Sequence, residues 1–135
     1  MTRILLVEDN PRDRRLVQIA LAEALDFEHS LEDASTFQDG LDHLDAHGAD
    51  VVLLDLNLPD AQGLESIARL REAHPEIPVI VLTGLEAREL GDEAIRAGAQ
   101  DFLVKGQMFG ELLWRSIRYA RERHRILLEL QAATH

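Results

Sequence analysis

Residues 51–63 read VVLLDLNLPDAQG, and no other stretch is as informative about the fold. Four consecutive aliphatic residues followed by a carboxylate, Asp55, are typical of a strand that is buried on both faces of a parallel sheet. Pro59 and Gly63 then predict a turn, and a helical pattern begins at Leu64. The sequence therefore predicts a strand-loop-helix unit of an α/β protein, with an acidic side chain at the carboxyl end of the strand.

The same alternation continues on both sides of this unit. The strong apolar runs are residues 4–7, 51–54, 79–82 and 102–104, and a weaker alternating pattern covers 27–33. Strands separated by helices predict right-handed crossovers and a sheet that is covered on both faces. We therefore expect one α/β domain with a flavodoxin-like, doubly wound, five-stranded parallel sheet of order 2-1-3-4-5.

Capping residues set the predicted limits of the helices. The first helix has Asn10 as its N-cap and Pro11 at its first position. Its apolar face is formed by Leu16, Val17, Ala20, Leu21, Ala24 and Leu25. A second helix begins after Ser35 or Thr36 and ends at Gly48. The fourth helix carries Ala87, Leu90, Ala94 and Ile95 and ends at Gly98.

Polar side chains follow the strong strands, at the edge where open α/β sheets bind ligands. They are Glu8, Asp9, Asp55, Thr83 and Lys105, and the last is the only lysine among fourteen basic residues. Asp55 on a rigid strand is a candidate nucleophile toward phosphorus. Glu8 and Asp9 supply further oxygen ligands of the kind that Mg²⁺ prefers. Thr83 and Lys105 would donate hydrogen bonds to phosphoryl oxygens.

Each of these residues also has a simpler explanation. The pair Glu8 and Asp9 would complement a helix dipole, and Asp55 would form a turn. Thr83 would cap a helix, and Lys105 would be a solvated surface charge. The convergence of a metal site, a nucleophile and two donors at one sheet edge favours a phosphoryl-transfer site.

Four segments of the chain resemble the receiver domain of two-component response regulators. They are LLVEDN at 5–10, VLLDLNLPDAQG at 52–63, VIVLTG at 79–84 and GAQDFLVK at 98–105. The resemblance implies that Asp55 accepts a phosphoryl group from the phosphohistidine of a sensor histidine kinase or a phosphotransfer protein. It also implies that Asp9, Asp55 and the backbone carbonyl of Asn57 hold Mg²⁺, with Glu8 assisting through water.

The resemblance further implies a conformational switch. Thr83 would move toward the phosphoryl group and Phe102 would turn inward behind it, which would remodel the surface of the fourth helix, fifth strand and fifth helix. The chain departs from the family pattern at Phe102, where tyrosine is frequent, and at Gly106, where proline in a cis bond is usual. A cis bond before a residue other than proline costs about 2.5–4 kcal/mol, so a trans bond is expected here.

The predicted function is a phosphoacceptor switch that catalyses only its own phosphorylation and slow dephosphorylation. One alternative is a receiver-like scaffold that is not phosphorylated. Another is a Mg²⁺-dependent phosphatase with an aspartyl nucleophile, which is disfavoured because Asn57 cannot serve as the second acid.

Composition limits the partners and the compartment. The net charge of −11 argues against direct nucleic-acid binding, because phosphate contacts require a basic face. The chain has no cysteine, no apolar run of membrane-spanning length and no signal-peptide pattern near Met1. We expect a cytoplasmic protein.

The last helix is predicted over residues 108–132 and is longer than a receiver domain needs. Leu113, Ile117, Ala120, His124 and Leu127 recur at four-three spacing. Residues 1–120 would form the receiver domain, and 121–135 would extend the helix for dimerisation or as a connector to an output domain. The alternative is ordinary packing of a final helix followed by a frayed tail.

Overall fold

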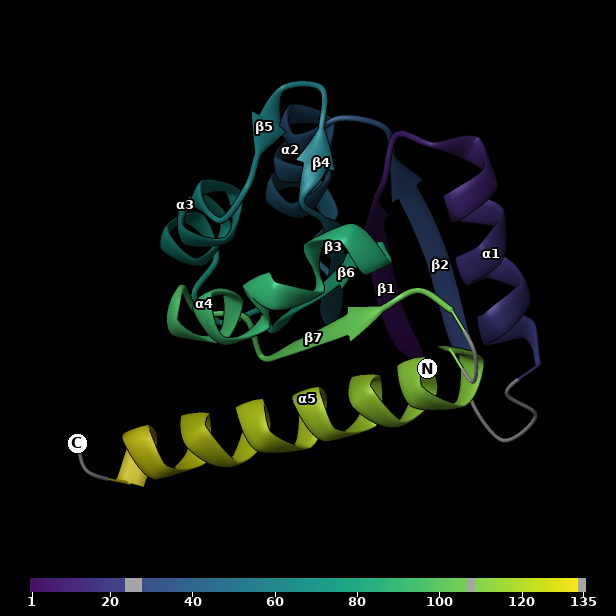
Figure 1. The fold of residues 1–135 in the computed structure, drawn as a ribbon. Helices are drawn as coiled ribbons and strands as arrows, with labels where there is room; N and C mark the ends of the chain where they lie inside the picture. Colours follow the sequence, from purple (N-terminus) through teal and green to yellow (C-terminus); the bar gives the residue numbers. More distant parts are fainter. Residues whose placement is uncertain (24–27, 107–108, 134–135) are drawn as a thin grey trace.

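The computed structural model describes residues 1–23, 28–106 and 109–133. Five parallel strands form its central sheet in the order β2-β1-β3-β6-β7 (Figure 1). They are β1 (Thr2–Val7), β2 (His29–Ala34), β3 (Val51–Asp55), β6 (Val79–Thr83) and β7 (Asp101–Val104). This is the predicted order 2-1-3-4-5, so the predicted fold class is confirmed. Residue 27 of the predicted second strand lies outside the described residues.

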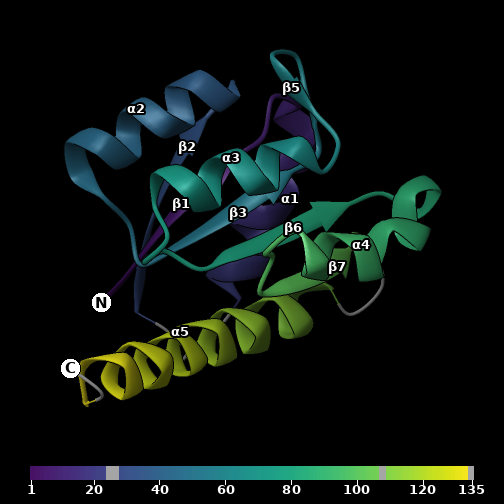
Figure 2. The same cartoon turned by 90° about the vertical axis from the view of Figure 1, so that its left-hand side faces the viewer.

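Helices cover both faces of the sheet, as Figure 2 shows for α2 and α3 on one side and α5 on the other. On one face, α1 (Pro11–Ala22) and α5 (Phe109–Ala133) bury side chains such as Val17 and Ile117 against Ile4 and Leu53. On the other face lie α2 (Phe37–His47), α3 (Glu65–Ala73) and α4 (Gly91–Arg96). Alternate residues of β1, β3 and β6 therefore enter two separate hydrophobic cores, which is why these three strands carry continuous apolar runs.

The predicted caps of the first two helices are present. The side chain of Asn10 accepts hydrogen bonds from the N–H groups of Arg12 and Asp13. Of the two candidates for the second cap, Thr36 is the one that accepts a hydrogen bond from Asp39. Leu16 was expected on the buried face of α1 but is 38% exposed, because this face is narrower than the apolar pattern. Ala24 and Leu25 lie outside the described residues.

The turn predicted at Pro59 and Gly63 is present, but two short strands beside it were not predicted, and the prediction of one continuous fourth helix was wrong. The turn after β3 contains a small antiparallel hairpin, β4 (Asn57–Leu58) with β5 (Ala61–Gln62). The fourth helix is not continuous: a 3₁₀ segment, η1 (Leu85–Leu90), precedes the short α4. The non-helical backbone lies at Ala87 (φ −115°, ψ 16°), within the 3₁₀ segment, and α4 then begins at Gly91. The missing side chain of Gly91 makes room for Phe102, because a Cβ there would lie 3.3 Å from the Phe102 ring.

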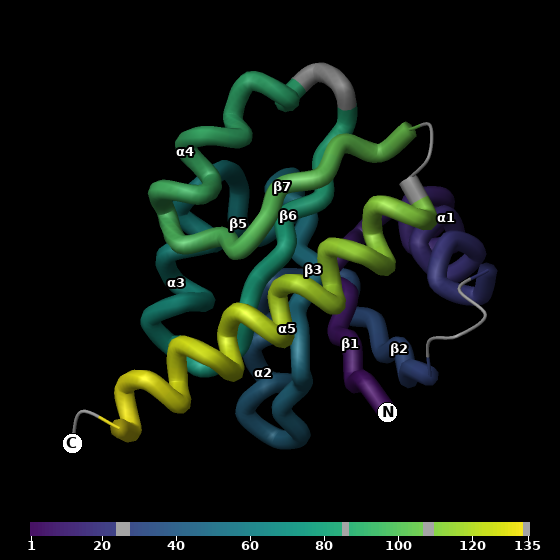
Figure 3. The backbone as a smooth tube through the Cα atoms, turned by 90° about the horizontal axis from the view of Figure 1, so that it is seen from below, coloured from purple at the N-terminus to yellow at the C-terminus, as the bar shows by residue number. Residues whose placement is uncertain are grey.

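The last helix is as long as predicted, but the regularly spaced apolar residues in its first half pack against the sheet. Leu113, Ile117 and Ala120 are buried against the sheet and are core residues rather than a coiled-coil seam. Figure 3 shows the C-terminal part of α5 continuing past the strands. Met108, the predicted start, lies outside the described residues. Within those residues, no helix has both the length and the apolar character needed to cross a membrane.

Candidate functional site

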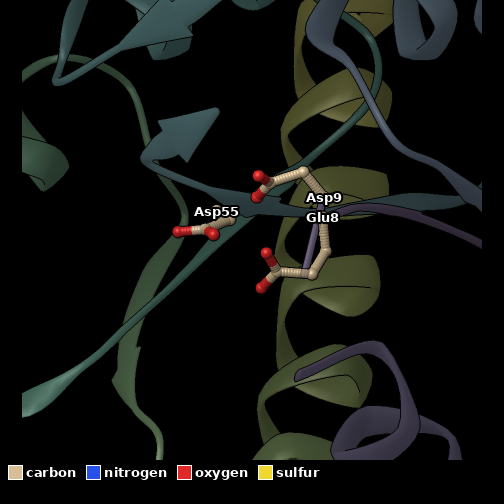
Figure 4. Close-up of side chains that lie close together, drawn as sticks. All are labelled: Glu8, Asp9 and Asp55. Atoms are coloured by element: carbon tan, nitrogen blue, oxygen red, sulfur yellow. The ribbon is translucent and has the colours of Figure 1, made fainter. Parts of the chain in front are cut away.

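Three carboxylates meet at the carboxyl edge of the sheet. Glu8 and Asp9 follow β1, and Asp55 ends the neighbouring β3. One oxygen from each residue lies within 4.8 Å of the others (Figure 4). Octahedral Mg²⁺ binds oxygen at about 2.0–2.1 Å, which places its ligand oxygens about 3–4 Å apart. The cluster therefore fits such a cation after a small closure of the side chains.

Burial sets the electrostatics of this cluster. Glu8 is 1% exposed and Asp55 is 9% exposed, whereas Asp9 is open to solvent. The pKa of Glu8 is raised to about 8, first by burial and then by the neighbouring Asp55, whose effect is larger than the opposing effect of Lys105. Ionisation of Glu8 beside Asp55 is therefore unfavourable in the metal-free site, and a bound cation would favour the ionised form.

Lys105 reaches the same site from the end of β7. Its ammonium lies 2.7 Å from Glu8 Oε1 and 2.9 Å from Asp13 Oδ2. Burial opposes the charged form, but the hydrogen bonds to Glu8 and Asp13 outweigh it and raise the pKa of Lys105. The Lys105 backbone N–H donates to the carbonyl of Thr83 at 2.8 Å. The structure thus brings the sole lysine to the predicted acidic cluster.

Sequence reasoning missed two contributors to the site, both in the first turn of α1. In the sequence Asp13 is only an acidic residue in the first turn of a predicted helix, and its place at the same sheet edge depends on the fold. Arg14 donates to the carbonyl oxygens of Glu8 at 3.1 Å and Asp9 at 3.2 Å, and so holds the turn that carries both acids. The reach of such a long side chain has no signature in the sequence.

The other predicted site residues lie on β4, β6 and β7. The backbone N–H of Asn57 donates to Asp55 Oδ1 at 3.1 Å, which orients the carboxylate. Thr83 is the last residue of β6, the strand next to β3, and is buried. Phe102 is half-buried and packs against the core that includes α4. The described residues contain no cis peptide bond, which agrees with the trans bond expected before Gly106.

The loop after Asp55 is also tied to α2. Asp60 accepts hydrogen bonds from the backbone N–H groups of Phe37 at 2.7 Å and Gln38 at 2.9 Å. Its pKa is lowered: burial acts in the other direction, but these hydrogen bonds and the charge of Arg69 outweigh it. An anion at a helix N-terminus satisfies N–H groups that have no partner within the helix.

Known proteins are similar to this chain in sequence and in fold. The PhoP transcriptional regulatory protein of Escherichia coli K12 is 34% identical over 103 residues, or 76% of this chain and 45% of that protein. The chain thus spans less than half the length of the curated relatives it matches. The NtrX receiver domain of Brucella abortus is 30% identical with a TM-score of 0.77, and the match covers 88% of this chain and 98% of that one.

A receiver domain protein from Clostridium thermocellum has the same fold, with a TM-score of 0.80 and 24% identity over 94% of this chain and 99% of that one. The family model that describes the response regulator receiver domain matches residues 4–115. Because this match covers most of the chain, from within β1 to within α5, the protein belongs to the response regulator receiver domain family.

Proposed function

We propose that this chain is a phosphoacceptor switch of a two-component system and that Asp55 is the acceptor. The donor is the phosphohistidine of a sensor histidine kinase or a phosphotransfer protein. A carboxylate oxygen of Asp55 attacks phosphorus, the new O–P bond forms, and the N–P bond breaks with its electron pair returning to the imidazole. The observation that carries this proposal is the meeting of Asp55, the acidic pair of β1 and the only lysine at one sheet edge.

Magnesium is the proposed cofactor, and the donor set of hard oxygen ligands supports it. Asp9, Asp55 and the backbone carbonyl of Asn57 would bind the ion, and Glu8 would act through water. A bound Mg²⁺ would neutralise charge on the phosphoryl oxygens and on the crowded carboxylates. Thr83 and Lys105 would donate to the remaining phosphoryl oxygens, where charge develops in the transition state.

The output of the switch is a change of surface. Thr83 and Phe102 are the proposed switch residues, and the packing of Phe102 between the core and Gly91 supports a link to α4. The protein would turn over no external substrate and would lose its phosphoryl group slowly by hydrolysis. It would act in the cytoplasm through protein partners without direct nucleic-acid contact, in keeping with its net charge of −11.

Residues 1–120 form the proposed receiver domain, and 121–135 extend its last helix. None of residues 121–133 is buried, and Leu127 and Leu130 are 49% and 58% exposed. Exposed leucines on a helix that projects from the domain support a role in dimerisation or in joining an output domain. Residues 134–135 lie outside the described part of the chain.

Intact mass spectrometry after incubation with acetyl phosphate tests the acceptor. We expect one phosphoryl adduct that requires Mg²⁺ and is absent from Asp55→Asn. Asp92→Asn, on the exposed surface of α4, is the matched control and should be phosphorylated like the native protein. If the folded native protein forms no adduct even when sampled within seconds, the phosphoacceptor proposal fails and an unphosphorylated scaffold takes its place.

A further inference from the structure

Lys105 is held by two acidic side chains in the unphosphorylated site, and only one of them belongs to the acidic cluster. Glu8 lies within that cluster beside Asp55. Asp13 lies outside it, in the first turn of α1, and its carboxylate is one-third exposed. Both contacts are at hydrogen-bond distance, 2.7 Å to Glu8 and 2.9 Å to Asp13.

We propose that Asp13 is a positioning residue that restrains Lys105 in the unphosphorylated protein and releases it when Asp55 is phosphorylated. This inference rests on the proposed function of Asp55. An ammonium group has three N–H donors, and two of them are directed at Glu8 and Asp13. Among the described contacts, none is a hydrogen bond from Lys105 to Asp55.

The competition follows from charge and position. A phosphoryl group on Asp55 would present three acceptor oxygens and nearly two negative charges, which is more than the single charge of Asp13. Lys105 can remain beside Glu8 while it turns toward this group, because Glu8 is a neighbour of Asp55. Asp13 therefore stabilises only the unphosphorylated state, and the link between α1 and the end of β7 is broken on phosphorylation.

Because Lys105 is the only lysine, its side chain can be observed alone. In protein labelled with ¹³Cε-lysine, NMR should show one lysine signal, and Asp13→Asn should shift it in the unphosphorylated state. With Mg²⁺ and beryllofluoride, which mimics the phosphoryl group, the signals of native and variant proteins should coincide. A persistent difference of the same size would overturn the release, and no shift in the unphosphorylated state would overturn the contact itself.

Phosphorylation kinetics give a second, independent readout. We expect acetyl phosphate to phosphorylate Asp13→Asn about three- to tenfold faster than native protein, because the charge of Asp13 no longer holds Lys105 away from Asp55. Asp13→Glu should restore the slower rate. Asp39→Asn, in the corresponding first turn of α2, controls for the loss of one acidic charge and should stay close to the native rate.

A slower reaction in Asp13→Asn would show that Asp13 supports Lys105 in the reaction and would overturn the proposal. Equal acceleration by Asp39→Asn would also overturn it, because the effect would then be one of net charge. If native protein gains no phosphoryl group, the proposed function fails, while the lysine signal of Asp13→Asn still reports whether the two side chains are in contact.

Discussion

Asp60 stabilises the start of α2 from a distant part of the chain. We expect Asp60→Ala to lower the free energy of unfolding by about 1–2 kcal/mol, because the N–H groups of Phe37 and Gln38 lose their acceptor. Urea unfolding at pH 7 measures this difference. Since the pKa of Asp60 is lowered in the folded state, the difference is present above its ordinary value of 3.8 and should shrink as the pH falls below it.

The control for this prediction is Asp39→Asn, also in the first turn of α2. In the described part of the chain its carboxylate accepts no hydrogen bond from the backbone, so its replacement should lower the free energy of unfolding by less than Asp60→Ala does. Equal losses in the two variants would mean that helix-dipole charge, rather than the two hydrogen bonds, accounts for the effect of Asp60.

Glu8 should give the metal-free protein a distinctive pH dependence. With its pKa near 8, the folded protein holds this proton in a range where the unfolded chain, near 4.5, has lost it. The free energy of unfolding should therefore fall as pH rises from about 5 to about 8. Urea unfolding in EDTA should show a smaller fall for Glu8→Gln. The same slope in both proteins would contradict the assignment.

The same residue links metal binding to proton release. Mg²⁺ favours the ionised carboxylate, so binding at pH 7 should release about one proton, and none near pH 9. Calorimetry in two buffers of different ionisation enthalpy counts these protons. Proton release that is unchanged between pH 7 and pH 9 would mean that Glu8 is already ionised before the metal binds.

At the scale of elements, α5 combines two surfaces in one helix. Ile117→Ala should lower the free energy of unfolding by about 2–5 kcal/mol, because it leaves a cavity in the core beneath the sheet. Leu127→Ala, on the exposed extension, should cost less than about 1 kcal/mol in dilute protein. Urea unfolding compares the two. Similar costs would show that the extension is packed as firmly as the first half of the helix.

Sedimentation at increasing protein concentration tests what the extension does. If residues 121–135 form a dimer contact, replacing both Leu127 and Leu130 by alanine should weaken the association without changing the stability of the monomer. A monomer at all concentrations, with and without beryllofluoride, would leave the connector role as the proposal for this segment.

At the scale of the whole molecule, charge is unevenly distributed. Residues 110–135 contain five arginines and three acidic residues, whereas the rest of the chain is strongly acidic, and the net charge is −11. The excess acidic side chains repel one another in the folded protein. Salt screens this repulsion when ionic strength rises from about 0.01 M to about 0.15 M, because the Debye length falls from about 30 Å to about 8 Å. We expect Tm at pH 7.5 in EDTA to rise by about 2–4 °C.

The comparison at pH 5 controls for specific salt effects. The isoelectric point is about 4.8, so little net charge remains at that pH and the same salt should change Tm much less. A Tm that falls with salt at pH 7.5 would instead indicate that attractive pairs, such as Lys105 with Asp13, outweigh the overall repulsion.

The amino-acid sequence alone is sufficient to predict the sheet and the edge at which the site lies. An unbroken aliphatic strand such as residues 51–54 removes its side chains from water only when both faces of the sheet are covered. Parallel strands then place their final residues at the same edge of the sheet. Asp55, the acidic pair of β1 and Lys105 can therefore be assigned to one site from strand order and residue type. The caps at Asn10 and Thr36 are also predictable, because they depend only on residues a few positions away.

Contacts between residues far apart in the chain depend instead on the tertiary structure. The pairing of Lys105 with Asp13, the capping of α2 by Asp60 and the close approach of Phe102 to Gly91 all involve residues brought together by the fold. The spacing of Leu113 and Ile117 likewise does not distinguish a coiled-coil seam from packing against the sheet. Periodicity shows that a face is apolar, but the partner that covers it depends on how the whole chain folds.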